Sequence, residues 1–168
     1  MKRIVLLLVL LIASTLLFAG EPVKGIGAGI STGIPFTVGA LGEYNFGPAY
    51  ASVELGYATG PYFMFRAGGG YNFPKPFVNS DLGMDLYLSI GGKFSGYLGS
   101  FSGNFVAVGA FGIPVTWSWY ANKIPIKVFA QAGPEIYFGS GSVDLNFFGS
   151  IGAMYVFSLE PKQSNVGN

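Results

Sequence analysis

Hydrophobic and polar residues alternate with a period of two along most of the chain. In the run Ile124–Phe138, for example, Ile126 and Val128 fall on one face, and Lys127 and Glu135 fall on the other. This period predicts strands with one apolar and one polar face. Clusters of Gly, Pro, Asn and Ser, typical of turns, separate eight such runs. The predicted strands are Lys24–Ser31, Phe36–Phe46, Ala49–Ala58, Tyr62–Phe73, Leu82–Phe94, Phe105–Tyr120, Ile124–Phe138 and Val143–Leu159.

The charged residues inside these runs, apart from Lys24 at the edge of the first, all fall on the polar face. They are Glu43, Glu54, Arg66, Asp85, Lys93, Lys127, Glu135 and Asp144. A Lys or Arg facing lipid at mid-membrane costs about 2–4 kcal/mol. Segregation to one face is therefore expected of a barrel whose apolar face meets lipid and whose polar face lines the lumen.

Composition supports a membrane location. Charged residues make up 10% of the chain, against roughly 25% in soluble proteins, and aromatic residues make up 17%. Beyond residue 20, Gly, Pro and polar residues interrupt every apolar run, so no membrane helix is predicted. Closed barrels are the other structure that satisfies all backbone groups within lipid. The predicted fold is all-β, an eight-stranded antiparallel up-and-down transmembrane barrel.

Aromatic pairs mark one rim of this barrel. The even-numbered runs end in such pairs, all on the apolar face and all at the same rim of an up-and-down barrel. The pairs are Tyr44 with Phe46, Tyr71 with Phe73, Trp117 with Trp119, and Tyr155 with Phe157. This arrangement predicts an aromatic girdle at the membrane interface. A matching belt at the other rim is predicted from Phe36, Tyr57, Phe63, Phe94, Phe105 and Phe138.

The ends of the chain differ from the barrel region. Residues 1–20 have a basic start, an apolar stretch and small residues at Ala19 and Gly20, which predicts a cleaved signal peptide. An uncleaved anchor is the rival interpretation. The barrel is expected over residues 21–159, followed by a polar C-terminal tail at 160–168.

The chain resembles the small eight-stranded outer-membrane barrels typified by the OmpA transmembrane domain, OmpX and OmpW. The last strand, with Gly149, Ile151, Ala153 and Tyr155 alternating up to Phe157, is similar to that family's C-terminal assembly signal, but the chain continues past this point. The resemblance implies a bacterial outer-membrane location, chain ends in the periplasm, and outer-membrane lipids and the assembly machinery as partners. It also implies short periplasmic turns at Gly47–Pro48 and Ala121–Lys123.

Alternatives to this architecture remain open from the sequence. Pro114 and Pro134 lie inside predicted strands, where a missing N–H interrupts the ladder, so local bulges are expected there. If Gly112–Pro114 is instead a turn, the strand count becomes ten. A soluble lipocalin-like barrel would place the apolar face inside.

Candidate chemistry is sparse. The chain has no histidine and no cysteine, which removes the usual general base, thiol nucleophile and zinc ligands. We expect no enzyme activity, cofactor, metal site or nucleic-acid partner. Glu43 and Glu54 are more readily explained by a lumenal ion-pair network than by acid–base catalysis. Gly25, Gly27 and Gly29 lie on the lumenal face of a strand with no helix following, so they do not form a phosphate loop.

Register predicts one specific contact. A hairpin centred on Gly60 sets Glu54 opposite Arg66, and we expect a salt bridge between them, with Glu43 as a further partner. An eight-stranded barrel is just filled by its side chains, which favours a structural envelope protein. A narrow channel or a carrier for a small or hydrophobic solute is the alternative. The lumenal glycines (Gly39, Gly68, Gly70, Gly91, Gly112, Gly133) leave room for an incomplete plug.

Overall fold

The described part of the chain consists of strands and their turns. The structure, a computed structural model, describes residues 24–60, 62–73, 77–79, 84–101, 103–121, 124–139 and 142–159. The strands are β1 (Gly25–Ile34), β2 (Thr37–Asn45), β3 (Ala49–Ala58), β4 (Tyr62–Asn72), β5 (Phe77–Asn79), β6 (Met84–Phe101), β7 (Asn104–Gly112), β8 (Val115–Ala121), β9 (Ile126–Gly139) and β10 (Ser142–Ser158). Among these residues no helix is long and apolar enough to cross a bilayer.

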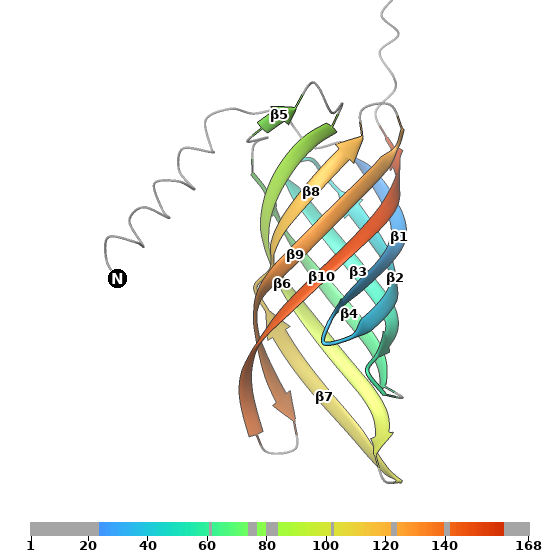
Figure 1. Ribbon diagram of the computed structural model, residues 1–168, viewed down its shortest axis with the longest axis vertical. Coiled ribbons are helices and arrows are strands. Elements are labelled where there is room, and N and C mark those ends of the chain that lie inside the picture. The colour runs from blue at the N-terminus through green and yellow to red at the C-terminus, as the bar shows by residue number, and fades with distance from the viewer. Residues whose placement is uncertain are drawn as a thin grey trace, which may run out of the picture.

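The strands form a closed antiparallel barrel (Figure 1). Its wall has eight positions around the barrel axis, each filled by one strand or by two strands end to end, and we call each of these a stave. Neighbouring strands pair in chain order, and β1 pairs with β10 from Gly25 opposite Ser158 to Ile34 opposite Gly149, which closes the cylinder. Successive strands β7 and β8 form one stave between β6 and β9. The short β5 pairs only with the start of β6 and is not a stave. The predicted eight-stranded up-and-down fold is confirmed.

The two ends of the barrel differ (Figure 1). At the end that holds Lys24 and Leu159, whose backbones are hydrogen-bonded at 3.1 Å, the staves finish close to one level. At the opposite end the β6–β7 and β9–β10 hairpins reach further than the β1–β2 hairpin. The proposed signal peptide (1–20) and polar tail (160–168) lie outside the described residues.

One predicted loop is wrong. The segment Ser95–Asn104, between the predicted strands Leu82–Phe94 and Phe105–Tyr120, was expected to be a loop, but β6 continues through Ser95 to Phe101 and β7 begins at Asn104. The alternation persists, with Lys93, Ser95 and Tyr97 buried inside. Gly96 lies on the outside, where an added Cβ would come within 2.2 Å of the Phe65 ring. A glycine is tolerated in this strand because a neighbouring aromatic ring covers the position where its side chain would lie.

The strand prolines produce neither a bulge nor a turn. On both sides of Ile113–Pro114 the pairing with β6 keeps the same register, since Lys93 faces Gly112 and Ile90 faces Val115. The Pro114 carbonyl accepts a hydrogen bond from the Gly91 N–H at 3.0 Å, and the Pro134 carbonyl accepts one from the Ile113 N–H at 3.0 Å. The expected bulges are therefore absent at these two sites, and Gly112–Pro114 is not the turn that ten staves would require.

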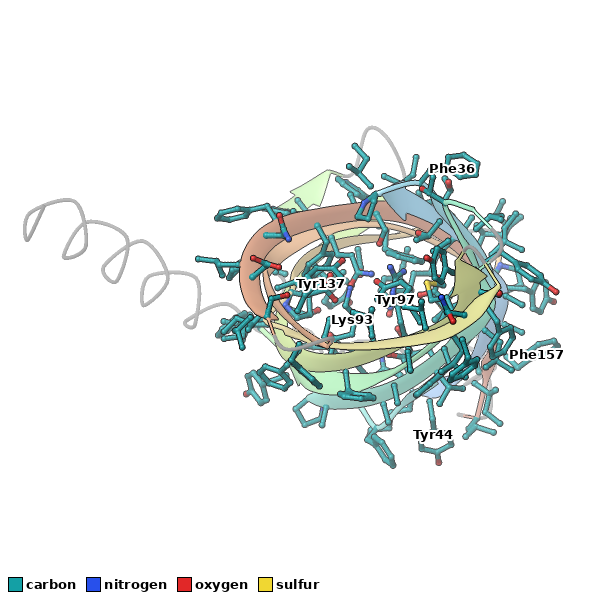
Figure 2. The ribbon with its side chains drawn as sticks, turned by 90° about the horizontal axis from the view of Figure 1, so that it is seen from below. Phe36, Tyr44, Lys93, Tyr97, Tyr137 and Phe157 are labelled. Carbon is teal, nitrogen blue, oxygen red and sulfur yellow. The ribbon has the colours of Figure 1, made fainter. Side chains whose placement is uncertain are left out.

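The apolar face points outward. Phe147 is 76% exposed and Val53 is 61% exposed, whereas Lys127 is 4% exposed. Among the strand positions whose side chains are described, every outward one is uncharged, and Thr32 and Ser100 are the outward hydroxyl residues besides tyrosines. Figure 2 shows Phe36, Tyr44 and Phe157 pointing away from the barrel. This orientation excludes the alternative of a soluble barrel with an apolar interior.

Candidate functional site

Six of the predicted lumenal charges form three ion pairs inside the barrel. Glu54 pairs with Arg66, Glu43 with Lys127, and Glu135 with Lys93. The side chains in these pairs are at most 9% exposed. A buried charge is tolerated when an opposite charge and hydrogen bonds compensate its lost hydration. Among the described side chains of the lumen, three carboxylates are thus matched by three cations.

The Glu54–Arg66 pair follows from the β3–β4 hairpin. The two residues face each other in the register, and the Nη1 of Arg66 lies 3.3 Å from Oε2 of Glu54. The expected salt bridge is confirmed. Ser31 of β1 donates a hydrogen bond to Glu54, and Nη2 of Arg66 donates to the Tyr97 hydroxyl at 3.3 Å. These contacts connect four staves across the lumen.

The expectation that Glu43 would join the Glu54–Arg66 pair was wrong. Glu43 instead binds Lys127 of β9, whose Nζ lies 2.6 Å and 2.8 Å from its two carboxylate oxygens. The same Nζ lies 5.6 Å from the centre of the Tyr120 ring and 5.9 Å from that of the Tyr50 ring, within the range of cation–π attraction. The cation that neutralises Glu43 is therefore Lys127 and not Arg66.

The Lys93–Glu135 pair is looser and is supported by other groups. Its Nζ–Oε1 distance is 3.9 Å, and Ser95 donates a 2.9 Å hydrogen bond to the same oxygen. The Nζ of Lys93 lies 3.3 Å from the centre of the Phe148 ring. Oε2 of Glu135 and Nζ of Lys93 make no hydrogen bond to the described residues. Such atoms are the ones that ordered water satisfies in a polar cavity.

Of the remaining two predicted charges, one lies outside this network and the side chain of the other is not described. Asp144 lies on β10 near its hairpin, where it is exposed and accepts a 3.4 Å hydrogen bond from Ser142. It is therefore a rim residue and not part of the enclosed lumen. Asp85 lies in β6 opposite Tyr120, and its side chain lies outside the described atoms.

Several lumenal residues were not predicted as site residues. Near the chain ends, Ser89 donates to Asn72 at 2.8 Å, and Asn72 donates to the Gly47 carbonyl at 2.9 Å. Asn45 donates to the Tyr120 hydroxyl at 3.3 Å. These residues lie on the polar face of their strands, so parity identifies them as lumenal. Their partners are on other staves, which parity cannot identify.

Side chains fill the lumen more completely than its glycines suggested. Tyr50 fills the space above Gly70 and Gly91, where an added Cβ would come within 2.9 Å of its ring or hydroxyl. Phe148 lies above Gly112 in the same way, at 3.0 Å. These glycines therefore accommodate large side chains and do not line an opening.

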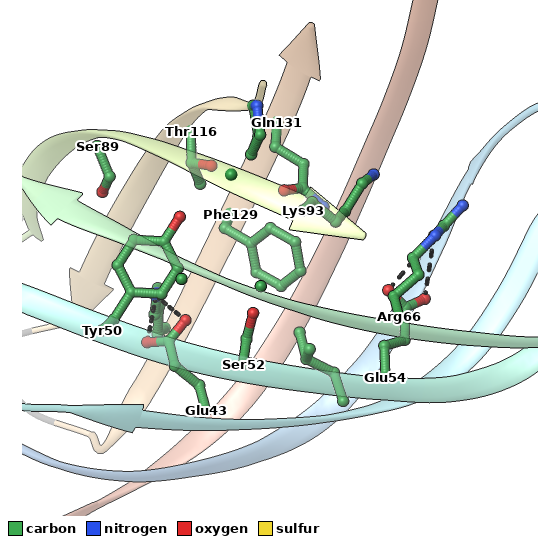
Figure 3. Close-up of a pocket in the computed structure, with 16 residues that line it drawn as sticks. Glu43, Tyr50, Ser52, Glu54, Arg66, Ser89, Lys93, Thr116, Phe129 and Gln131 are labelled. Carbon is green, nitrogen blue, oxygen red and sulfur yellow. Dashed lines mark hydrogen bonds and ion pairs between the residues drawn. The ribbon is translucent and has the colours of Figure 1, made fainter. Parts of the chain in front are cut away.

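The ion pairs enclose a small cavity (Figure 3). Its volume is about 40 Å³, and the Phe129 ring lies between the Glu54–Arg66 pair and Glu43. A cavity of this volume holds a few water molecules at most. The charged part of the lumen can therefore hold water between its ion pairs, but it has no room for a sugar or a peptide.

All eight residues of the predicted aromatic girdle lie on outward positions of the wall. Each pair lies near the chain-end side of its strand, and most of the rings are exposed. The rings of Tyr44 and Phe46 lie 4.4 Å apart, and those of Tyr155 and Phe157 lie 4.7 Å apart. The second predicted belt, from Phe36 to Phe138, is exposed on the same wall nearer the hairpin end.

Comparison with known proteins adds one similar structure. No family model matches the chain, and no curated protein matches it. The crystal structure of the N-terminal β-barrel domain of Pseudomonas aeruginosa OprF aligns with 81% of this chain and 100% of its own, at 15% identity and a TM-score of 0.48.

Proposed function

We propose that the protein is an integral outer-membrane barrel with a structural role in the cell envelope and a lumen that does not conduct solutes. The observation that supports this proposal is the segregation of charge. Outward strand positions are uncharged in the described residues, and six lumenal charges are paired inside. A wall of exposed Phe, Leu, Ile and Val suits hydrocarbon and is unsuitable for water.

Two features favour a sealed lumen over a pore. The six charges of the described lumen are paired with each other, so none of them stands alone. Tyr50, Phe129 and Phe148 fill the space between them, which leaves a cavity of about 40 Å³. The export segment predicted over residues 1–20 supports delivery to the envelope.

Membrane fractionation tests the location. We expect the protein in outer-membrane fractions after a carbonate wash, with gel migration that changes on heating because the folded barrel resists detergent. Release of the protein by the wash would contradict the proposal.

Planar-bilayer recording tests the sealed lumen, independently of location. We expect no steady conductance from the wild-type protein. Steady steps that change on Lys127→Met would show a conducting lumen and favour the channel alternative, because this residue lies at the centre of the lumen.

A further inference from the structure

The hairpin end of the barrel holds a second cavity, distinct from the charged lumen. It has a volume of about 300 Å³ and is lined mainly by Pro35, Ala58, Tyr62, Tyr97, Val108 and Tyr137. We call this cavity the vestibule. Figure 2, which looks into this end, shows Tyr97 and Tyr137 inside the ring of strands beside Lys93. No charged side chain of the described residues lines it.

The vestibule walls are aromatic and tightly supported. The rings of Tyr97 and Tyr137 are stacked, with centroids 5.9 Å apart and an interplanar angle of 22°. The Tyr62 ring lies against the backbone of Gly99, where an added Cβ would come within 2.4 Å of it. Below them, Met64 and Ala110 are fully buried and pack against Tyr97. The cavity therefore has a packed floor and ring-lined sides.

The vestibule surface is almost wholly apolar. The Tyr97 hydroxyl accepts a hydrogen bond from Arg66 at 3.3 Å, which fixes its position. The Tyr137 hydroxyl is buried. A molecule in the vestibule therefore meets the aromatic rings of these two tyrosines and not their hydroxyls.

We propose that the vestibule binds a small uncharged molecule with a flat apolar body. A volume of about 300 Å³ is at the lower end of ligand pockets, which suits one or two fused rings. Tyrosine rings accept such a body by stacking or edge contacts. A charged ligand is excluded because no lining residue would compensate for its lost hydration.

The shape of the rim gives access from the bilayer. On the β1–β4 side the vestibule wall is low and consists of the turn residues Pro35 and Thr59. Phe36 and Tyr57 lie next to these turns, 67% and 62% exposed on the outer wall. A molecule dissolved in the lipid near these residues therefore reaches the cavity over a short rim.

Methyl NMR in lipid nanodiscs tests this proposal with 2-naphthol as the probe. Nanodiscs avoid detergent tails, which would compete for an apolar cavity. With labelled alanines, we expect saturable shifts at Ala58 in the vestibule and Ala110 in its floor. Ala107 and Ala153 face outward and should show weak shifts that rise linearly as the probe enters lipid. Linear shifts at all four methyl groups would mean partition into lipid only and would overturn the proposal.

Substitutions localise the binding. Val108→Trp should fill the cavity and abolish the saturable shifts at Ala58, and Ala58→Leu serves the same purpose if Val108→Trp does not fold. Tyr137→Phe keeps the ring and removes only a hydroxyl that lies beneath the vestibule surface, so it should leave the affinity unchanged. Tyr50→Phe, the same change in the charged lumen, should also leave the affinity unchanged. Saturable binding that survives both cavity-filling substitutions would overturn the proposal, and heat-dependent gel migration confirms that each variant is folded.

Discussion

At the scale of single residues, the lumen depends on matched charges. Glu54 is 4% exposed and Arg66 is 5% exposed, so each has lost most of its hydration and depends on the other. A buried pair contributes little over an apolar pair of equal volume, but removal of one partner leaves an uncompensated charge. The network is therefore expected to be sensitive to single substitutions and tolerant of paired ones.

Arg66→Met is expected to destabilise the folded barrel by about 3–5 kcal/mol, because it leaves the Glu54 carboxylate buried without a cation. Urea unfolding from lipid vesicles measures this change. The double variant Glu54→Leu with Arg66→Met should be more stable than Arg66→Met alone. A double variant that is less stable than either single variant would contradict this interpretation.

The sequence predicted one of the three ion pairs, the one whose two residues lie close together along the chain. Glu54 and Arg66 lie on one hairpin, so the turn at Gly60 fixes their register. Glu43 and Lys127 are 84 residues apart and meet across the barrel. Their contact depends on the stagger of all the staves between them and on side-chain length, and neither can be read from local alternation.

At the scale of strands, the sequence located seven of the staves closely and misjudged where β6 ends. Alternation is reliable where large apolar residues mark the outward face, as in β9. It weakens where glycines stand in the strand, as at Gly96 on the outward face and Gly99 on the inward face, because glycine is also typical of turns. In the structure an aromatic ring lies against each glycine. The Phe65 ring covers Gly96 on the outside of the barrel, and the Tyr62 ring covers Gly99 on the inside. Such contacts between strands leave no trace in a strand's own sequence.

The seam between β1 and β10 is where the barrel closes, and glycine controls how closely the two strands approach. An added Cβ at Gly29 would lie 2.1 Å from the Ala153 carbonyl oxygen, which is backbone and cannot move aside. Gly29→Ala is expected to destabilise the barrel by at least about 2 kcal/mol. Gly42→Ala is the matched control, since its nearest contact would be a Val53 methyl at 3.6 Å, and it should change stability by about 0.5 kcal/mol or less. Equal unfolding midpoints in urea for the two variants would contradict this role for the seam.

At the scale of the whole molecule, the outer wall determines how the barrel sits in a bilayer. The only two tryptophans of the chain, Trp117 and Trp119, lie on β8 within the proposed girdle. Tryptophan prefers the membrane interface. We therefore expect fluorescence quenching to be stronger by lipids brominated near the headgroup than by lipids brominated near the end of the acyl chain. The reverse order would place this rim in the hydrocarbon core.

The unequal hairpins make a sharper prediction about depth. β10 continues from Gly149, the last partner of β1, to Ser142. At about 3.3 Å per residue and a tilt of about 40°, this extension rises roughly 18 Å along the barrel axis. The short β1–β4 side already matches an apolar band about 25 Å tall. The end of the β9–β10 hairpin should therefore stand in water although its outward residues are apolar.

Two valines can test whether lipid covers the middle of the outer wall but not the end of the β9–β10 hairpin. Val143 and Val53 are 73% and 61% exposed on the outer wall, one near the tip of the β9–β10 hairpin and one near mid-wall. The chain has no cysteine, so one introduced thiol is a unique label. In vesicles, a membrane-impermeant maleimide should modify Val143→Cys and spare Val53→Cys, because lipid covers only the second. Equal labelling would mean that no bilayer surrounds the wall. Protection of both would mean that the long hairpins also lie in lipid, with the barrel tilted toward them.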